Sequence, residues 1–254
     1  MRAVVSKAEI ESDIASRFEN AFRLQDKRAA LTLATGVAEI DGLTGGVPRG
    51  GISEIFGPAS SGRTSLLFSM LAYATTHEEI CALIDISDVF SPTAAAPSGL
   101  DFERLLWVRC GTNLEHGFKA TDLILHAGGF GLVILDMGDV AGKDARRIIS
   151  SWWYRFRRTV ENKPTAVVVI SSESSTRSCA SLTLELNGIG EWVTTKDLQS
   201  HTVQRGNVLP MRTLAQSKVV AHANLLRVNS IKVNRRRPIT NGLNESHFRS
   251  NYNF

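Results

Sequence analysis

The chain has 254 residues, of which 43% are apolar, and a formal net charge of +4; this length allows one α/β domain with a substantial core and terminal additions. No apolar run approaches the roughly 20 residues of a membrane span, and the N-terminus lacks the apolar segment of a secretory signal, so we expect a cytoplasmic protein with no membrane partner. The three cysteines lie far apart and fit neither a zinc site nor a disulfide framework.

The charge is distributed unevenly along the chain. Residues 201–254 contain nine lysines or arginines and one acid, whereas acids outnumber bases in residues 1–200. A basic C-terminal part on a nearly neutral body favours a polyanionic partner, with nucleic acid as the first candidate.

The first 34 residues form a separate helical segment in our prediction. Ile10, Ile14, Phe18 and Phe22 recur every four positions between charged residues, which predicts an amphipathic helix over residues 7–30. The apolar stripe either packs on the chain's own domain or docks on a partner or a second copy, and the sequence does not choose between these.

A phosphate-binding loop is indicated where the apolar strand Ile52–Phe56 runs into two glycines five positions apart, before a helical run over 64–74. The spacing is that of the P-loop pattern G-x-x-x-x-G-K-[ST], with Arg63 in place of the lysine. Arginine keeps the charge, but its planar fork does not reproduce the point contact of an ammonium between two phosphates. The residues expected to bind phosphate or nucleotide are Gly57, Pro58, Ala59, Ser60, Ser61, Gly62, Arg63, Thr64 and Ser65.

Further buried strands alternate with helices beyond this loop. Strands are predicted at 80–85, 105–109, 132–136 and 166–170, and helices at 114–127 and 143–161. This order predicts an α/β fold with a mostly parallel central sheet covered by helices on both faces. Weaker alternation after Ser181 predicts antiparallel strands that extend the sheet within a core of residues 35–240, followed by a flexible tail over 241–254.

The fourth strand ends in a candidate metal ligand. Four apolar residues precede Asp136, the Walker B pattern in which a strand-end carboxylate orients Mg²⁺, and the hydroxyl of Thr64 is the second expected ligand. The alternative is that Asp136 is a structural carboxylate. The histidines show no metal-ligand spacing.

Two basic segments are candidates for contacts with DNA or a partner. In the helix predicted at 143–161, Ile149, Trp152, Trp153 and Phe156 fall on one stripe, which favours a core helix with a solvated basic face over an aromatic platform for bases. The densest basic run lies near the C-terminus, where phosphate contacts and a solvated tail are both compatible with the pattern. The candidate residues are Arg147, Arg158, Lys232, Arg235, Arg236 and Arg237.

Between Thr35 and Ser172 the chain resembles the RecA family. The match is carried by Gly50–Thr64, by Cys81–Asp85 and by Val133–Asp136. It implies a RecA-like core in which the strand at 166–170 lies between the P-loop strand and the Walker B strand.

The resemblance also shows departures at the catalytic positions. Ser87 stands where the family has its catalytic glutamate, and a serine does not act as a general base. Ser91 and Ala94 replace the adenine-contacting acid and tyrosine, and Ser172 replaces the γ-phosphate-sensing glutamine. We therefore assign no catalytic residue and expect slow or absent hydrolysis, with ATP or ADP and Mg²⁺ bound without turnover or the site left empty.

Three acids near these positions remain open as substitute bases: Asp85, Asp88 and Glu173.

Within the RecA relatives the chain looks like the ImuA family, through the segments Leu105–Arg109 and Ser181–Leu186. That resemblance implies an accessory role in the SOS response and in DNA-damage-induced mutagenic translesion synthesis. The implied partner is an ImuB-type Y-family polymerase homologue, with RecA and single-stranded DNA as further candidates. The two alternatives are a DNA-dependent ATPase of recombinase type and a regulator that caps or disrupts RecA filaments.

Overall fold

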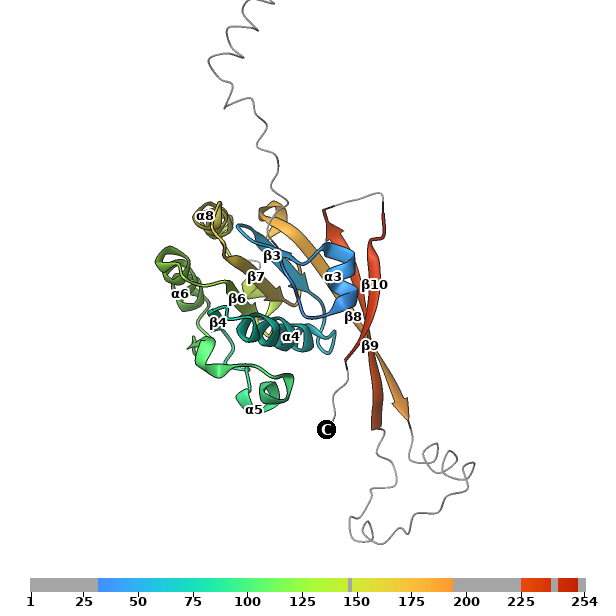
Figure 1. Cartoon of the computed structure of the whole chain (residues 1–254). Helices are drawn as coiled ribbons and strands as arrows, with labels where there is room; N and C mark the ends of the chain where they lie inside the picture. Colours follow the sequence, from blue (N-terminus) through green and yellow to red (C-terminus); the bar gives the residue numbers. More distant parts are fainter. Residues whose placement is uncertain (1–31, 146–147, 194–224, 239–241, 251–254) are drawn as a thin grey trace, which may run out of the picture. The chain divides into compact units, whose positions relative to one another are not determined.

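The computed structural model describes residues 32–145, 148–193, 225–238 and 242–250 (Figure 1). The predicted N-terminal helix with Ile10, Ile14, Phe18 and Phe22 lies outside the described residues, and so does Arg147. No helix in the described part of the chain is long and apolar enough to cross a membrane.

The described residues form an eight-stranded sheet in the order β10-β9-β8-β3-β7-β6-β4-β5. The strands β3, β7, β6, β4, β5 and β8 run parallel, whereas β9 is antiparallel to β8 and β10 to β9. The prediction that the strand at 166–170 separates the P-loop and Walker B strands is confirmed by β7. The bounds are β3 Ile52–Phe56, β4 Cys81–Asp85, β5 Leu105–Arg109, β6 Leu132–Met137, β7 Ala166–Ser171, β8 Ala180–Val193, β9 Leu225–Arg237 and β10 Glu245–Ser250.

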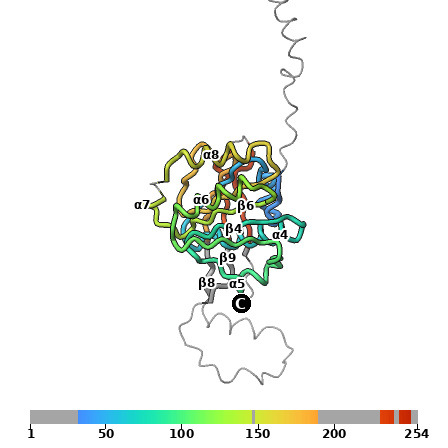
Figure 2. Tube along the Cα trace, turned by 90° about the vertical axis from the view of Figure 1, so that its left-hand side faces the viewer, coloured from blue at the N-terminus to red at the C-terminus, as the bar shows by residue number. Residues whose placement is uncertain are grey.

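Helices cover both faces of the sheet, as predicted (Figures 1 and 2). Because successive residues of a buried strand point to opposite faces, β4, β6 and β7 supply apolar residues to two separate core clusters. Helix α4 (Arg63–Thr76) packs into one cluster with α3 (Ala38–Thr44), and α6 (Leu114–Ala127) and α8 (Ser150–Val160) pack into the other. Smaller elements are β1 Thr32–Leu33, β2 Val47–Pro48, α5 Pro92–Ala95 and α7 Gly142–Ala145, with 3-10 turns η1 Ala96–Ser98, η2 Phe102–Arg104 and η3 Arg177–Cys179.

The prediction of a single helix over residues 143–161 is wrong. The structure has α7 and then α8, with Ile149 in an extended conformation (φ −69°, ψ 125°) as the residue before α8. Its side chain is 67% exposed and does not join the apolar stripe, whereas Trp153 and Phe156 are buried against Phe118 of α6. Ser150 and Ser151 explain the break, since serine favours the start of a helix over its interior.

The C-terminal part also differs from the prediction in two respects. Strand β8 is parallel to β3, and β10 occupies residues that we predicted as a flexible tail. Phe248 of β10 lies opposite Ile231 of β9, and both side chains are buried. A single apolar anchor in a polar segment gives too weak a periodic signal to predict a strand.

A short segment after β7 accounts for the parallel orientation of β8. Ser171 at the end of β7 lies beside Phe56, and Ala180 at the start of β8 lies beside Ile52. Residues 172–179 therefore return across β3, from its carboxyl end to its amino end. This crossing segment contains only the 3-10 turn η3.

Glu54, in the middle of β3, holds the crossing segment in place. Its side chain is fully buried and accepts hydrogen bonds from Ser174 Oγ (2.8 Å), from the Ser175 amide (2.5 Å) and hydroxyl (3.2 Å), and from the Thr176 amide (2.9 Å). A buried carboxylate is tolerated only when such donors replace its water shell.

We predict that Glu54→Gln destabilises the protein by about 3 kcal/mol, because an amide NH₂ would face backbone N–H donors in a buried position. Urea unfolding followed by circular dichroism measures the change. Glu103→Gln is the matched control, since Glu103 is exposed in η2, and we expect it to shift stability by less than about 0.5 kcal/mol. Equal effects of the two substitutions would contradict the role of Glu54.

Candidate nucleotide site

The predicted nucleotide-site residues gather at the carboxyl edge of the parallel sheet. Strand β3 ends at Phe56 and leads into the loop 57–62, and Arg63 begins α4. Strand β7 pairs with both β3 and β6, with Ser171 beside Phe56 on one side and beside Met137 on the other. The loop, Ser172 and Asp136 therefore lie at one edge, where ligands of parallel α/β sheets bind.

The loop is packed closely against the C-terminal strands. A Cβ on Gly57 would clash with the Leu186 carbonyl oxygen, and one on Gly188 would clash with the Ser60 carbonyl oxygen. Gly62 has φ +93°, and a Cβ there would clash with the side chain of Ile231 from β9. Strands β8 and β9 thus fix the conformation of the P-loop, although they lie far from it in the sequence.

The start of α4 offers donors to an anion. The residue that precedes the helix, Gly62, provides no side-chain cap for the first-turn amides, so these amides and the helix dipole favour a phosphate at this end. Thr64 is exposed in the first turn, and the buried Ser61 hydroxyl has no hydrogen-bond partner within the described structure. These residues fit a phosphate group.

Arg63 turns toward the end of β6. Its Nη1 donates a hydrogen bond to the carbonyl oxygen of Gly138 (2.8 Å). The contact is close, since a Cβ on Gly138 would lie 2.8 Å from Arg63 Nη1 and 3.0 Å from Asp136 Oδ1. The guanidinium group therefore has a protein acceptor of its own, beside the Walker B carboxylate.

Asp136 lies at the end of β6 and accepts a hydrogen bond from the Gly138 amide (2.8 Å) at Oδ1. Burial raises the pKa of this carboxyl to about 6, and the Asp85 carboxylate adds to the rise, against the Gly138 amide and the Arg63 charge. With Thr64, it would hold Mg²⁺, which supplies charge neutralisation to bound phosphates. The raised pKa means that this ligand must first lose a proton in mildly acidic solution.

Asp85 and Asp88 are held by other contacts. Asp85 is buried and accepts hydrogen bonds from the amides of Val89 (3.1 Å) and Phe90 (2.9 Å) and from Trp107 Nε1 (3.3 Å). Asp88 forms an ion pair with Arg109 (3.5 Å). Asp85 therefore has a structural role, whereas Asp88 lies at the surface beside Arg109.

The other positions compared with the family carry serines. Ser87 is half-buried, and Ser91 Oγ accepts a hydrogen bond from the Ala94 amide (3.4 Å) and caps the start of α5. Ser172 is half-buried just beyond β7, and the exposed carboxylate of Glu173 follows it. Phosphoryl transfer depends on positioned charges and on a group that orients water, and a serine stands at each of the family's base and sensor positions.

The basic run at 232–237 lies in β9, and its side chains fall into two groups according to their contacts. Lys232 pairs with Glu245 (2.7 Å), and Arg235 donates to the carbonyl oxygens of Leu43 and Leu243 (both 2.6 Å). These two side chains tie β9 to its neighbours, so our expectation that they serve DNA has no support in their contacts.

Arg236 and Arg237 instead line a concavity of about 570 Å³ beside Phe56. Arg236 pairs with Glu185, and Arg237 Nη1 donates to the Ser178 carbonyl oxygen (3.4 Å). Arg177 of the crossing segment joins them, a residue that the sequence analysis missed. Arg158 lies elsewhere, exposed on α8.

Sequence reasoning also missed Glu54, Gly188 and Ile231. Glu54 had a visible signal, an acid inside an apolar strand, which usually marks a buried polar contact. Gly188 and Ile231 gave none, because their contacts with the loop are made across more than a hundred residues. All three cysteines are buried and free, and no group of three or more potential metal ligands from His, Cys, Asp and Glu occurs in the described part of the chain.

The fold and this edge define a P-loop α/β protein. The family model for the RecA N-terminal domain matches residues 19–145, half of the chain. Protein RecA of Rickettsia canadensis (strain McKiel) is 38% identical over 92 residues, which cover 36% of this chain and 26% of that relative. The chain belongs to the RecA family, and the aligned stretch spans about a quarter of the length of this curated relative.

We predict that Asp136→Asn is increasingly stabilising, relative to the unsubstituted protein, as pH rises from 4 to 7. Because the folded pKa of about 6 lies above the reference value of 3.8, the folded state binds more protons than the unfolded state between these values, and stability falls as pH rises. The variant has no titrating carboxyl at this position. The difference between its free energy of unfolding and that of the unsubstituted protein should therefore grow by at most about 3 kcal/mol between pH 4 and 7.

Urea unfolding in EDTA at a series of pH values measures this difference. A stability difference that does not change across pH 4 to 7 would contradict the raised pKa.

Proposed function

We propose that this RecA-family chain is an accessory protein that keeps the nucleotide-binding architecture without effective hydrolysis. The observation that carries the proposal is the hydrogen bond from Arg63 to Gly138, which gives the residue at the lysine position a protein acceptor in place of the phosphates. Ser87 and Ser172 support it, since neither side chain can act as a base or reach as far as a glutamine. The backbone amides of residues 59–64, with Thr64 and Asp136, would bind nucleotide and Mg²⁺ without turnover.

The role that we propose is that of an adaptor in DNA-damage-induced mutagenic translesion synthesis. The resemblance of the segments at 105–109 and 181–186 to the ImuA family supports it. The partner is then an ImuB-type Y-family polymerase homologue, and RecA is a second contact. A protein in this role needs surfaces for partners and DNA, and it does not need a fast ATPase.

The concavity at Arg177, Arg236 and Arg237 is our proposed contact with DNA. Three arginines face one carboxylate there, that of Glu185, and three hydroxyl groups, of Ser174, Ser178 and Thr183, also line it. This composition suits phosphate groups, which arginine and hydroxyl donors bind without regard to sequence.

We predict phosphate release close to background, with or without single-stranded DNA, because no group replaces the missing base. Arg63→Lys alone should raise the rate by less than about tenfold, since Ser87 and Ser172 remain. Steady-state phosphate release measures both. Turnover at the level of a recombinase that is stimulated by DNA and abolished by Asp136→Ala would instead establish the alternative, a DNA-dependent ATPase.

The adaptor role predicts a stable complex with the ImuB-type polymerase. Co-expression followed by size-exclusion chromatography should show a single peak that contains both chains, and Arg63→Lys should not change it. Failure of the two full chains to co-elute or to interact by calorimetry would contradict the adaptor role.

For DNA, we predict that Arg177→Gln and Arg237→Gln each lower the salt dependence of oligo-dT binding by about one unit of slope. Fluorescence anisotropy over a salt titration measures the slope. Arg104→Gln is the control, since Arg104 in η2 pairs with Asp101 and does not line this concavity. A slope that is unchanged by both substitutions would exclude this concavity as the phosphate contact.

A further inference from the structure

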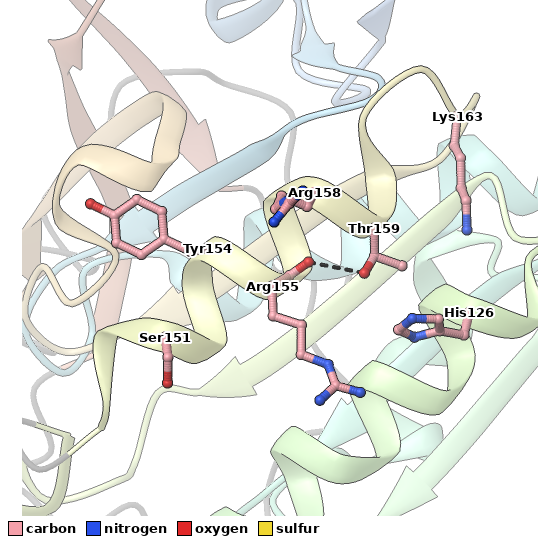
Figure 3. Close-up of a pocket in the computed structure, with 7 residues that line it drawn as sticks. All are labelled: His126, Ser151, Tyr154, Arg155, Arg158, Thr159 and Lys163. Atoms are coloured by element: carbon pink, nitrogen blue, oxygen red, sulfur yellow. Dashed lines mark hydrogen bonds between the residues drawn. The ribbon is translucent and has the colours of Figure 1, made fainter.

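A second concavity, of about 670 Å³, lies between α6 and α8, and neither nucleotide nor the proposed DNA contact uses it (Figure 3). These helices pack on the core cluster opposite to that of α4, the helix that begins at the P-loop. We call this concavity the α6–α8 pocket. It is lined by His126, Ser151, Tyr154, Arg155, Arg158, Thr159 and Lys163.

The positive charge in the α6–α8 pocket is only partly neutralised. Arg155 makes a bidentate pair with Asp122 of α6, with Nε to Oδ1 at 2.7 Å and Nη2 to Oδ2 at 2.5 Å. Lys163 Nζ donates to the Leu125 carbonyl oxygen (2.8 Å), near the end of α6. Among the described residues no acid pairs with Arg158 or Lys163, so three cations face the single carboxylate of Asp122.

The Arg155–Asp122 pair gives the pocket a fixed wall. A bidentate arginine–carboxylate pair restrains both side chains, and Asp122 is largely buried while Arg155 remains exposed. Thr159 donates a hydrogen bond to the Arg155 carbonyl oxygen (2.9 Å), as Figure 3 shows. A ligand therefore meets a formed surface and loses little free energy in ordering it.

A large apolar surface lines the pocket beside these cations: the ring of Tyr154, a residue of α8 that is 52% exposed. Tyrosine and arginine are the residues enriched at the centres of protein interfaces. Nucleic-acid surfaces that hold a single strand present several aromatic rings for successive bases. Among the described residues that line this pocket, Tyr154 is the one Phe, Tyr or Trp side chain.

We propose that the α6–α8 pocket binds an acidic segment of a partner protein, in which carboxylates flank an apolar side chain. The carboxylates pair with Arg158 and Lys163, and the apolar side chain covers the ring of Tyr154. The proposal goes beyond the accessory role described above, because it assigns a surface and a ligand chemistry and does not depend on whether the P-loop hydrolyses ATP.

The test uses the full chain and a fluorescein-labelled peptide in which glutamates surround one leucine. We expect saturable binding by fluorescence anisotropy, weakened at least about tenfold by Arg158→Glu, because the reversed charge repels the peptide. The matched control is Arg157→Glu, the same charge change on the adjacent exposed residue of α8, which does not line the pocket. It should change the affinity by less than about twofold.

Two further comparisons separate the proposed ligand from other anions. Replacing the peptide's leucine with asparagine, or Tyr154 of the protein with serine, should weaken binding, whereas a peptide with glutamines for glutamates should not bind. The proposal is overturned if the acidic peptide does not bind, or if Arg157→Glu weakens binding as much as Arg158→Glu. It is also overturned if Arg158→Glu abolishes oligo-dT binding but leaves peptide binding unchanged.

Discussion

Glu54, buried in the middle of β3, accepts hydrogen bonds from residues 174–176 of the crossing segment. By holding residues 174–176 over β3, the buried carboxylate allows the chain to return across a single strand and to start β8 parallel to it. Because β8 then lies beside β3, Leu186 and Gly188 contact the P-loop directly, and β9 brings Ile231 against Gly62. A single buried charge thus links the strand order to the shape of the nucleotide site.

The two properties of a P-loop, phosphate binding and hydrolysis, depend on different groups. Binding phosphate uses amides at a helix start, and these are present at the start of α4. Hydrolysis uses positioned cations and a group that orients water. Arg63 donates a hydrogen bond to the Gly138 carbonyl oxygen, beside the Asp136 carboxyl, whose pKa is raised by burial. Because serines occupy the family's base and sensor positions, 87 and 172, we propose that the site keeps phosphate binding without effective hydrolysis.

Local patterns predicted most of the parallel half of the sheet, because each buried strand is a continuous apolar run and α6 begins and ends at the predicted residues. The place of β7 followed from the resemblance to the RecA family. Features set by distant contacts could not be predicted: the parallel β8 depends on Glu54, β10 depends on one buried phenylalanine, and the acceptor of Arg63 is a backbone carbonyl. The contacts of the basic run at 232–237 could not be predicted either, since the partners of its side chains lie in α3, β8 and β10.

We propose that the site does not distinguish the γ-phosphate, and the affinities of ATP and ADP measured under identical conditions test this property. With Arg63 bound to Gly138 and serines at positions 87 and 172, we predict that the two nucleotides bind within about threefold of each other, a difference below about 1 kcal/mol, in isothermal titration calorimetry with Mg²⁺. ATP bound more than about a hundredfold more tightly than ADP would show that the γ-phosphate is still recognised and would contradict the account.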